Sequence, residues 1–492
     1  MKTLNLLAFD FGASSGRAVL GKYKDRKLEI QIIHRFVNEP IEVSGHLYWN
    51  ISRFLEEIKH GLIKYVDMTN EPLDGIGIDT WGSDYGLLDA KGKLLGNPYH
   101  YRDNRTDGMF EQAFSIMPRE EIFKRTGIAF HPFNTIYQLL SAKINEPELL
   151  EQAETMLLMP DLIAYFLTGQ KSSEYTVAST GQLVDADTRD WNKEILEIMG
   201  FPKKIFAHLQ QPGAIKGNLS STLCQEVDIP PVPVIAVAGH DTASAIVAVP
   251  ATEDKFVYLS SGTWSLLGVE VSKPVINEKT LKWNFTNEGG IEGTYRLLRN
   301  VMGLWVVQEC KRQWDSEGYV SEFGQLVELA KQSEPFYCFI DPDDEVFYSP
   351  GDMPTRVQRF CENTGQKVPR HKRQILRCVF ESLALKYRWV IDRLEEIVGR
   401  KRIGKLYIVG GGTKNELLNQ LTADSLGQKV VAGPSEATAV GNLLVQIGTL
   451  QHNMSLTEMR QVVANSFDCK VYEPRNSSAW DVAYQRFLKL LQ

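Results

Sequence analysis

A short motif occurs twice in this chain: an apolar strand, a turn of small residues containing glycine, and a second apolar strand. The first copy covers residues 6–20 and the second covers residues 256–269. An apolar run that resumes directly after a glycine-containing turn predicts a β-hairpin. The second copy starts near the midpoint of the 492 residues. The repeat therefore predicts two related halves that arose by internal duplication.

The rest of the chain shows the periodicities of an α/β protein. Apolar residues recur at helical spacing in several segments, and short apolar runs end in polar groups or glycines. The predicted helices cover 51–66, 375–398 (ended by Gly399), 415–426 and 436–449, and the predicted strands cover 76–80 and 428–432. Alternation of this kind predicts sheets with helices on both faces.

Length and composition set the domain number and exclude two kinds of partner. A chain of 492 residues exceeds what one core supports, so we expect domains at 1–248 and 249–492, with the boundary near 246–254. The net charge is 54 − 61 = −7, which argues against nucleic acid and anionic membranes as partners. No apolar stretch reaches the ~18 residues of a membrane span. We expect a cytoplasmic protein that is a monomer or a small homo-oligomer.

Six cysteines are scattered along the chain, at Cys224, Cys310, Cys338, Cys361, Cys378 and Cys469. None belongs to a C-x-x-C pair or lies near a histidine cluster, which argues against zinc. Cys361 and Cys378 are 17 positions apart, and whether they pair is left open. A reducing cytoplasm favours free thiols.

Asp241 is the candidate general base. The run 234–238 predicts a buried strand, and Gly239, His240 and Asp241 follow it before a helix of small residues. In open α/β sheets, ligands bind outside the carboxyl ends of the strands, where a carboxylate can accept a proton from a substrate hydroxyl. Asp is also a common helix N-cap, and this segment alone favours the cap.

Two turns have the features of phosphate and nucleotide sites. In the first hairpin, Gly12 and Gly16 permit close backbone approach, and the N–H and hydroxyl groups of Ser14 and Ser15 with the Arg17 guanidinium suit phosphate oxygens. Asp10 suits Mg²⁺ through water. An ordinary hairpin is the alternative, and the chain has no G-x-x-x-x-G-K-[ST] motif. The triplet Gly410–Gly412 after an apolar run permits a flat ligand to lie against the backbone.

Taken together, these segments resemble the FGGY carbohydrate kinases of the actin-like ATPase superfamily. The resemblance runs in order from about residue 6 to about residue 475, and its most specific segments are 10–17, 77–82, 240–245, 287–290 and 300–305. It implies an α/β fold class with two actin-like, ribonuclease H-like domains and a ligand cleft between them. The match is closest to the rhamnulose-phosphorylating members. It implies transfer of a phosphoryl group from ATP, with Mg²⁺, to the C1 hydroxyl of L-rhamnulose during L-rhamnose degradation.

The resemblance also assigns roles to residues of this sequence. It implies that Asp241 is the catalytic base and that Asp10 binds Mg²⁺ through water. The implied sugar contacts are Asp79, Trp81, Gly82, His240, Asp241, Thr242 and Asn300. The implied ATP contacts are Ala13, Ser14, Ser15, Gly16, Arg17, Thr263, Gln308 and Gly411. We expect Asn300 to open a helix, with Gln308 about two turns further along.

The identity of the substrate depends on positions that sequence patterns define less sharply. Tyr101 stands where many FGGY kinases carry the Trp of a Trp-x-Asp-x-Arg pattern. A 6-deoxy ketose presents a methyl group, and Trp81, Phe130 and Phe133 are the candidates to contact it. Two alternatives remain: an FGGY kinase for fuculose, xylulose, ribulose or glycerol, and a non-catalytic actin-like ATP-binding scaffold.

Overall fold

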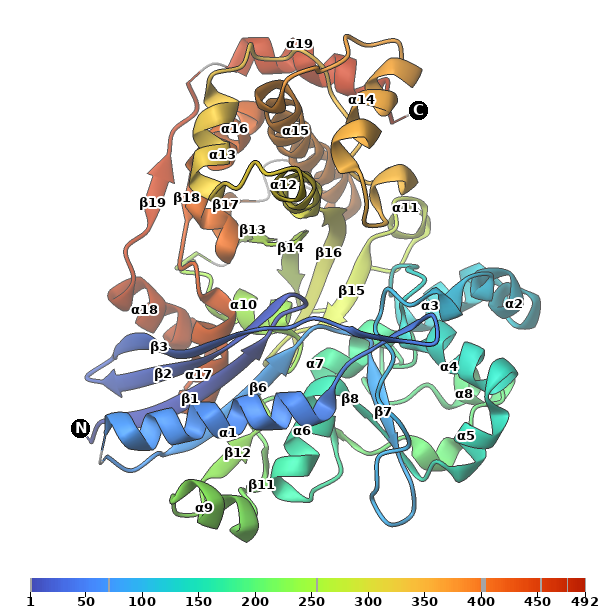
Figure 1. The fold of residues 1–492 in the computed structure, drawn as a ribbon, viewed down its shortest axis with the longest axis vertical. Coiled ribbons are helices and arrows are strands. Elements are labelled where there is room, and N and C mark those ends of the chain that lie inside the picture. The colour runs from blue at the N-terminus through green and yellow to red at the C-terminus, as the bar shows by residue number, and fades with distance from the viewer. Residues whose placement is uncertain are drawn as a thin grey trace. The chain divides into compact units, whose positions relative to one another are not determined.

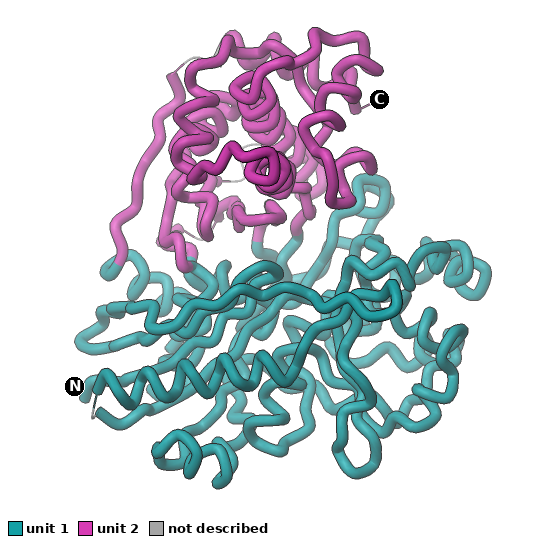
Figure 2. Tube along the Cα trace, in the orientation of Figure 1, with its two compact units in different colours: residues 1–248, 270–297, 437–466 teal, residues 249–269, 298–436, 467–492 magenta. Residues whose placement is uncertain are grey.

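The chain forms two compact units in a computed structural model (Figures 1 and 2). The structure describes residues 2–69, 71–253, 255–399, 404–451, 454–475 and 477–491. The first unit contains residues 1–248, 270–297 and 437–466, and the second contains 249–269, 298–436 and 467–492. Two segments of the first unit thus come from beyond residue 248. Asp254, in the predicted boundary, lies outside the described residues.

The first unit is built on a sheet with the strand order β11-β12-β6-β1-β2-β3. These strands are β1 (Leu4–Phe11), β2 (Ser15–Lys24), β3 (Lys27–Val37), β6 (Gly75–Thr80), β11 (Ile215–Asn218) and β12 (Pro233–Ile235). β1 pairs antiparallel with β2 and parallel with β6, which pairs parallel with β12. Every residue of β1 and β6 is buried, as expected for parallel strands covered on both faces.

Helices from distant parts of the sequence pack closely against the sheet of the first unit. Phe9 and Ala18 lie against Gly61 of α1 (Ile51–Met68), where an added Cβ would come within 2.7 Å of the Phe9 ring. Gly77 in β6 permits equally close approach by α17 (Ala437–Leu450), because an added Cβ would lie 2.2 Å from the Asn442 side chain. Helix α17, although far from the rest of the first unit in the sequence, is therefore an integral part of that unit (Figure 2).

The second unit repeats the same strand arrangement. Its strands follow the order β16-β14-β13-β17-β18-β19 in a seven-stranded sheet whose remaining strand, residues 286–289, lies next to β16. The strands are β13 (Phe256–Ser261), β14 (Trp264–Val271), β16 (Tyr295–Met302), β17 (Lys405–Val409), β18 (Val430–Ala432) and β19 (Lys470–Tyr472). β13 pairs antiparallel with β14 and parallel with β17, which pairs parallel with β18. The hairpin β13–β14 thus occupies the position that β1–β2 has in the first unit, in agreement with the predicted duplication.

The predicted elements match the structure closely at both ends of the chain. Both hairpins form, and the predicted helices are α1, α15 (Lys372–Val398), α16 (Glu416–Leu426) and α17. Gly399 ends α15 with a left-handed φ of 66°, as a helix-terminating glycine does. The strand expected over 234–238 is shorter than predicted, because β12 ends at Ile235.

The remaining elements complete the two units. They are β4 (Ile41–Val43), β5 (His46–Tyr48), β7 (Tyr85–Leu88), α2 (Met109–Ile116), α3 (Arg119–Thr126), α4 (Thr135–Asn145), α5 (Pro147–Gln152), β8 (Thr155–Leu158), α6 (Met159–Thr168), β9 (Ser173–Glu174), α7 (Tyr175–Ala178), α8 (Lys193–Ile198), β10 (Leu209–Gln210), α9 (Ser221–Val227), α10 (Asp241–Val247), α11 (Glu278–Lys282), β15 (Thr286–Gly289), α12 (Trp305–Ser316), α13 (Phe323–Lys331), α14 (Met353–Asn363), α18 (Leu456–Ser466) and α19 (Ser477–Leu488). Over the described part of the chain, none of these helices has both the length and the apolar composition needed to cross a membrane.

The six cysteines are all free thiols. Three of them, Cys338, Cys361 and Cys378, are buried in the second unit with their sulfur atoms within 4.8 Å of one another, a spacing that a metal ion could bridge. Sequence spacing did not reveal this cluster, because a loop and the helices α14 and α15 bring the three residues together only in the fold.

Candidate active site

Three acidic residues gather at one edge of the first unit's sheet. Asp10 lies near the end of β1, and Asp79, its partner in the parallel register, lies near the end of β6. Beyond β12, a bridge between Thr80 and His240 brings the start of α10 to the same edge. Asp241 is the first residue of α10. This is the carboxyl edge of parallel strands, where ligands bind in open α/β sheets.

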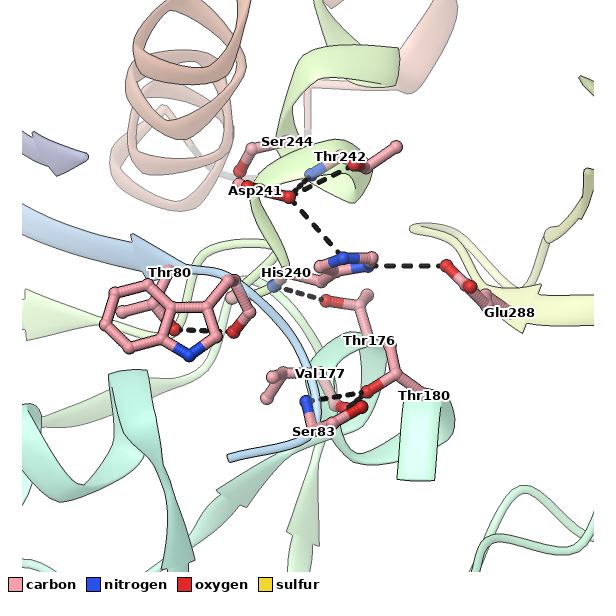
Figure 3. Close-up of polar contacts among 12 residues, drawn as sticks. Thr80, Ser83, Thr176, Val177, Thr180, His240, Asp241, Thr242, Ser244 and Glu288 are labelled. Carbon is pink, nitrogen blue, oxygen red and sulfur yellow. Dashed lines mark hydrogen bonds and ion pairs between the residues drawn. The ribbon is translucent and has the colours of Figure 1, made fainter. Parts of the chain in front are cut away.

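Asp241 presents a partly exposed carboxylate at this edge. Its Oδ1 accepts hydrogen bonds from the Thr242 backbone N (2.5 Å) and Oγ1 (3.1 Å), and it lies 3.4 Å from Nε2 of His240 (Figure 3). Its side chain keeps 31% of its surface exposed. His240 rather than Asp241 is the N-cap residue of α10. Asp241 therefore does not fill the N-cap position that was the alternative reading of this segment.

His240 is held by a buried ion pair that lies behind it. Its Nδ1 is 3.3 Å from Glu288 Oε2 and 3.1 Å from Arg296 Nη2, and the two charged side chains are themselves 3.0 Å apart. Burial disfavours ionisation of Glu288, but the nearby Arg296 guanidinium favours it, and the pKa of Glu288 is lowered below its usual value. Sequence analysis noted the segment 287–290 but missed Arg296, because no local pattern connects it with His240.

The backbone before Asp241 is fixed by a second buried carboxylate. Glu174 Oε2 accepts hydrogen bonds from the Gly239 backbone N (2.9 Å) and from Thr176 Oγ1 (2.6 Å). Thr176 Oγ1 in turn accepts from the His240 backbone N (3.3 Å; Figure 3). Burial raises the pKa of Glu174 to about 7. Sequence analysis did not select Glu174, which lies 65 residues before its partner Gly239.

Asp79 and Asp10 form a buried acidic pair. Asp79 is fully buried, and its Oδ2 accepts a hydrogen bond from Asn442 Nδ2 (2.6 Å). Burial, followed by the neighbouring Asp10 carboxylate, raises the pKa of Asp79 well above its usual value. Asp79 Oδ1 has no hydrogen-bond partner among the described residues, whereas Asp10 contacts Arg17 Nε at 2.9 Å. An unsatisfied oxygen next to a second carboxylate is the donor set that a hard divalent cation prefers.

The turn of the first hairpin is ordered by its own backbone and by Asn38. The Gly12 N donates to Ser15 O (3.0 Å), and Asn38 Nδ2 donates to Gly12 O (2.6 Å). Ala13 is half-buried and Ser14 is exposed, so the tip is accessible. Gly16 differs from the expectation, since its missing Cβ would lie 2.1 Å from the ring of Phe36. The close approach at Gly16 is therefore to Phe36 within the protein.

The loop after β6 holds the predicted sugar contacts Trp81 and Gly82. Trp81 is 6% exposed, stacks on Trp49 with 4.0 Å between ring centroids, and donates from Nε1 to Asp84 Oδ2 (2.8 Å). Gly82 lies against Thr180, whose Oγ1 would be 2.9 Å from an added Cβ. Thr180 Oγ1 also accepts a hydrogen bond from Ser83 N (Figure 3). The indole of Trp81 is thus mainly part of the core.

The aromatic residues Phe130 and Phe133 have different environments. Phe130 is 9% exposed and belongs to the hydrophobic cluster around α3 and α4. Phe133 is half-buried and stacks face to face on His131, with 4.9 Å between centroids. His131 is close enough to Glu288 to influence its ionisation. Of the three apolar candidates, Phe133 keeps the most accessible ring.

In the second unit, Thr263 and Gln308 are brought together as expected. Thr263 Oγ1 donates to Gln308 Oε1 at 3.2 Å, and the Trp305 backbone N at the start of α12 donates to Thr263 O. Asn300 was predicted to open the helix that carries Gln308, and this was wrong: Asn300 lies in β16. Gly303 separates strand from helix, and a Cβ added to it would lie only 2.8 Å from the Ser265 backbone N.

The glycine triplet follows β17 as predicted. Gly410 adopts a left-handed φ of 86°, a conformation that favours glycine. Gly412 packs against Ser261 of β13, whose Oγ would be only 2.0 Å from an added Cβ. Gly411 is exposed and has nothing within 4 Å of its missing Cβ. It therefore offers an open backbone surface.

Comparison with known proteins gives one consistent family. Models of the N-terminal and C-terminal domains of the FGGY family of carbohydrate kinases match residues 5–248 and 257–449. A rhamnulokinase of Bacteroides thetaiotaomicron is 45% identical over 98% of this chain and 98% of its own length. A rhamnulokinase of Bacillus subtilis is 42% identical over 95% of each chain.

The fold is also shared with solved structures of low sequence identity. A gluconate kinase from Lactobacillus acidophilus superposes with a TM-score of 0.81 at 17% identity, covering 99% of this chain and 98% of that one. A Plasmodium falciparum glycerol kinase with ADP has a TM-score of 0.76 at 16% identity, with 99% and 98% covered.

Proposed function

Because the chain belongs to the FGGY family of carbohydrate kinases, we propose that it transfers the γ-phosphoryl group of ATP to the C1 hydroxyl of L-rhamnulose. The products are L-rhamnulose 1-phosphate and ADP. The relatives at 45% and 42% identity carry the name rhamnulokinase and match nearly the whole chain. The observation that carries the proposal is the partly exposed Asp241 carboxylate at the carboxyl edge of the first unit's sheet.

Asp241 is proposed as the general base. All of its contacts described above fall on Oδ1, which assigns the proton-accepting role to Oδ2. As the C1 oxygen forms a bond to the γ-phosphorus, its proton moves to Oδ2, and the bond from phosphorus to the β-phosphate oxygen breaks to release ADP. A loose transition state requires little activation of the attacking oxygen, so a carboxylate of ordinary basicity is sufficient.

Sugar recognition is proposed to use groups around His240. The side chains of His240 and Thr242 contact Asp241, and Gly82 and Asn300 are further proposed contacts. Asp79 is fully buried, so we propose that it acts on Asp10 and a cation rather than on the sugar. Trp81 is proposed to support the loop through Trp49 and Asp84, and Phe133 to offer the accessible apolar ring.

ATP binding is proposed to use both hairpins. In the first, the N–H and hydroxyl groups of Ala13, Ser14 and Ser15 with the Arg17 guanidinium would bind phosphate oxygens. In the second unit, Thr263 and Gln308, which share a hydrogen bond, and the open backbone at Gly411 would bind the rest of the nucleotide. Gly16 is proposed to shape the turn by packing against Phe36.

The residues around Asp10 fit Mg²⁺. Asp10 would hold the ion, directly or through water, and the unsatisfied Asp79 Oδ1 would accept from its hydration shell. When bound, the ion would neutralise charge that develops on the phosphate oxygens. A cytoplasmic location is also proposed, supported by the six free thiols. A monomeric or small homo-oligomeric state is proposed with it.

The test is a substrate panel with coupled detection of ADP. Purified protein is assayed with L-rhamnulose, L-fuculose, D-xylulose, D-ribulose and glycerol, and Asp241→Asn serves as the matched inactive control. We expect L-rhamnulose to give the highest kcat/KM, with slower turnover of L-fuculose. A higher kcat/KM for xylulose or glycerol would refute the substrate assignment but leave the kinase assignment intact. ATP binding without turnover of any member of the panel would favour the scaffold alternative.

A further inference from the structure

The imidazole of His240 is surrounded on both nitrogens by charged groups of the first unit. Nδ1 faces Arg296 Nη2 at 3.1 Å. Nδ1 also lies 3.3 Å from Glu288 Oε2, and Nε2 faces Asp241 Oδ1 at 3.4 Å (Figure 3). His240 is 7% exposed and Arg296 is completely buried. With the ring position fixed by these contacts, the location of its proton decides what it can do for Asp241.

The contact with Arg296 determines that location. A guanidinium contains only hydrogen-bond donors, so a hydrogen bond from Nη2 to Nδ1 requires a lone pair on Nδ1. In a neutral imidazole the proton is then on Nε2. Glu288 Oε2 lies 3.0 Å from the same Nη2 and forms an ion pair with it, although that oxygen has no hydrogen-bond partner among the described residues. A second bond, from Arg296 Nε to the Gly289 carbonyl (2.9 Å), fixes the orientation of the guanidinium plane.

We propose that Arg296 is a positioning residue that holds His240 as the neutral Nε2–H tautomer, so that the ring donates toward Oδ1 of Asp241. The inference rests on the proposed function, in which Asp241 accepts the hydroxyl proton. His240 then joins the Thr242 N and Oγ1 as a third donor to Oδ1, and Oδ2 is left to face the substrate hydroxyl. Glu288 compensates the buried positive charge of Arg296.

The competing arrangement is an imidazolium that donates to Glu288 from Nδ1 and to Asp241 from Nε2. In this arrangement the Nδ1–H of His240 would point toward the N–H groups of Arg296 Nη2, 3.1 Å away, so two donors would face each other. The Asp241 carboxylate would also be paired with a cation. A carboxylate paired in this way is a weaker base. The two arrangements therefore predict different spectra and different rates.

The first test is the tautomer of His240 in the wild-type protein. Protein labelled with ¹⁵N and ¹³C only in histidine is examined by NMR at pH 7, and the His240 signals are assigned by their loss in His240→Gln. We expect the Nε2–H pattern. An Nδ1–H or imidazolium pattern would overturn the proposal. This readout does not require turnover, so failure of the proposed kinase function and failure of the tautomer assignment are separate results.

The second test uses the double variant Glu288→Gln/Arg296→Met. Removing both charges together avoids leaving one of them buried and unpaired, which is strongly destabilising. We expect the Nε2–H preference to be lost and kcat to fall on the order of ten- to a hundredfold, the usual range for a hydrogen bond to a charged group, with the KM for ATP unchanged. Unaltered tautomer and unaltered kcat in this variant would overturn the proposal.

Two controls separate positioning from general loss of packing. Glu288→Gln alone retains the Arg296 donor, so it should keep the Nε2–H tautomer even if its melting temperature falls. Glu270→Gln breaks another ion pair of the first unit, the one with Arg460, which does not contact His240. It should lower stability without changing the His240 spectrum. If the double variant does not fold, the wild-type and Glu288→Gln spectra still decide the question.

Discussion

The hairpins β1–β2 and β13–β14 have the same strand pairing, but the side chains at their ends differ: they are charged in the first hairpin and uncharged in the second. At the end of β1, Asp10 stands opposite Arg17 in register and next to Asp79 in the parallel strand. At the corresponding end of β13, Ser261 stands opposite Ser265, and Ser260 lies next to Val409. One backbone arrangement therefore supports a charged strand edge in the first unit and an uncharged one in the second.

The difference indicates a division of labour that a duplicated fold permits. Phosphoryl transfer uses a cation that offsets the phosphate charge and a group that accepts the proton of the attacking hydroxyl. In the proposed function, Asp10 and Asp79 of the first unit serve the cation and Asp241 accepts the proton. Hydroxyl, amide and bare backbone groups bind a nucleotide without adding charge, and the second unit supplies these at Thr263, Gln308 and Gly411. If this is correct, changes in the first unit should affect kcat and pH dependence, and changes in the second should affect ATP affinity.

The largest effect is expected from Asp241→Asn. The amide cannot accept the hydroxyl proton, so kcat should fall on the order of 10²–10⁴-fold, the range of general-base assistance, while ATP binding is retained. The measurements are steady-state kinetics, ATP titration and melting temperature. Thr263→Val in the second unit is the matched comparison and should mainly raise the KM for ATP. If the Asp241→Asn enzyme retains more than about a tenth of wild-type kcat, Asp241 is not the general base and the first unit does not supply one at this position.

The fold and much of the site followed from local sequence patterns, because each depends on neighbouring residues. Hairpins, helix ends and strand-end carboxylates are encoded within about ten residues, and Asp10, Asp79 and Asp241 do converge as predicted. The roles of Arg296 and Glu174, and the contact of Glu288 with His240, were not predicted, since their partners at positions 239 and 240 are 48 to 65 residues away in the sequence. The packing of Trp81 on Trp49 and of Gly16 on Phe36 was not predicted either, because sequence does not show what packs against a side chain.

Asn300 illustrates a different limit. The segment after it has the apolar spacing of a helix, but β16 continues through Met302 because its residues pair within the sheet. Gly303 then provides the close approach to Ser265 that allows the chain to turn into α12. Tertiary pairing overrides local periodicity at such boundaries.

A pH-dependent stability is expected from the buried carboxylates of the first unit. The pKa of Glu174 is raised to about 7, so the folded state binds its proton more tightly than the unfolded state. The contribution of Glu174 to the unfolding free energy is therefore fully present when the pH is below 4.5, the ordinary pKa of the group. It is lost as the pH rises through about 7. The loss amounts to about 3 kcal/mol. Asp84, with a pKa raised to about 6, adds a loss of the same sign at slightly lower pH.

The measurement is urea unfolding between pH 5 and pH 8. Glu174→Gln should flatten the decline in unfolding free energy with pH, whatever its effect on stability at pH 5. Glu154→Gln, which changes an exposed glutamate paired with Lys204, should leave the decline as steep as in the wild type. An unchanged slope in Glu174→Gln would show that other groups cause the pH dependence.

A pair of glycine substitutions compares the two turns directly. Gly16→Val should lower the unfolding free energy by about 1–3 kcal/mol, since the added atoms collide with Phe36 and overpack the core. Gly262 has no neighbour closer than 3.7 Å to its missing Cβ, so Gly262→Val should fold normally and raise the KM for ATP severalfold. Thermal melts and ATP-dependent kinetics distinguish the two outcomes. Equal loss of stability in both variants would mean that the second turn is also only structural.

The smallest effect is expected at the apolar end of the sugar. Phe133 keeps an accessible ring stacked on His131, whereas Trp81 is 6% exposed and bonded to Asp84. Phe133→Ala should therefore reduce the preference for L-rhamnulose over L-fuculose by several-fold, within the 1–3 kcal/mol that an apolar contact contributes to selectivity. The KM for ATP should not change. Trp81→Ala should instead lower the melting temperature, because it removes a core side chain. If Trp81→Ala loses the sugar preference and Phe133→Ala keeps it, with both variants equally stable, then Trp81 rather than Phe133 contacts the apolar end of the sugar.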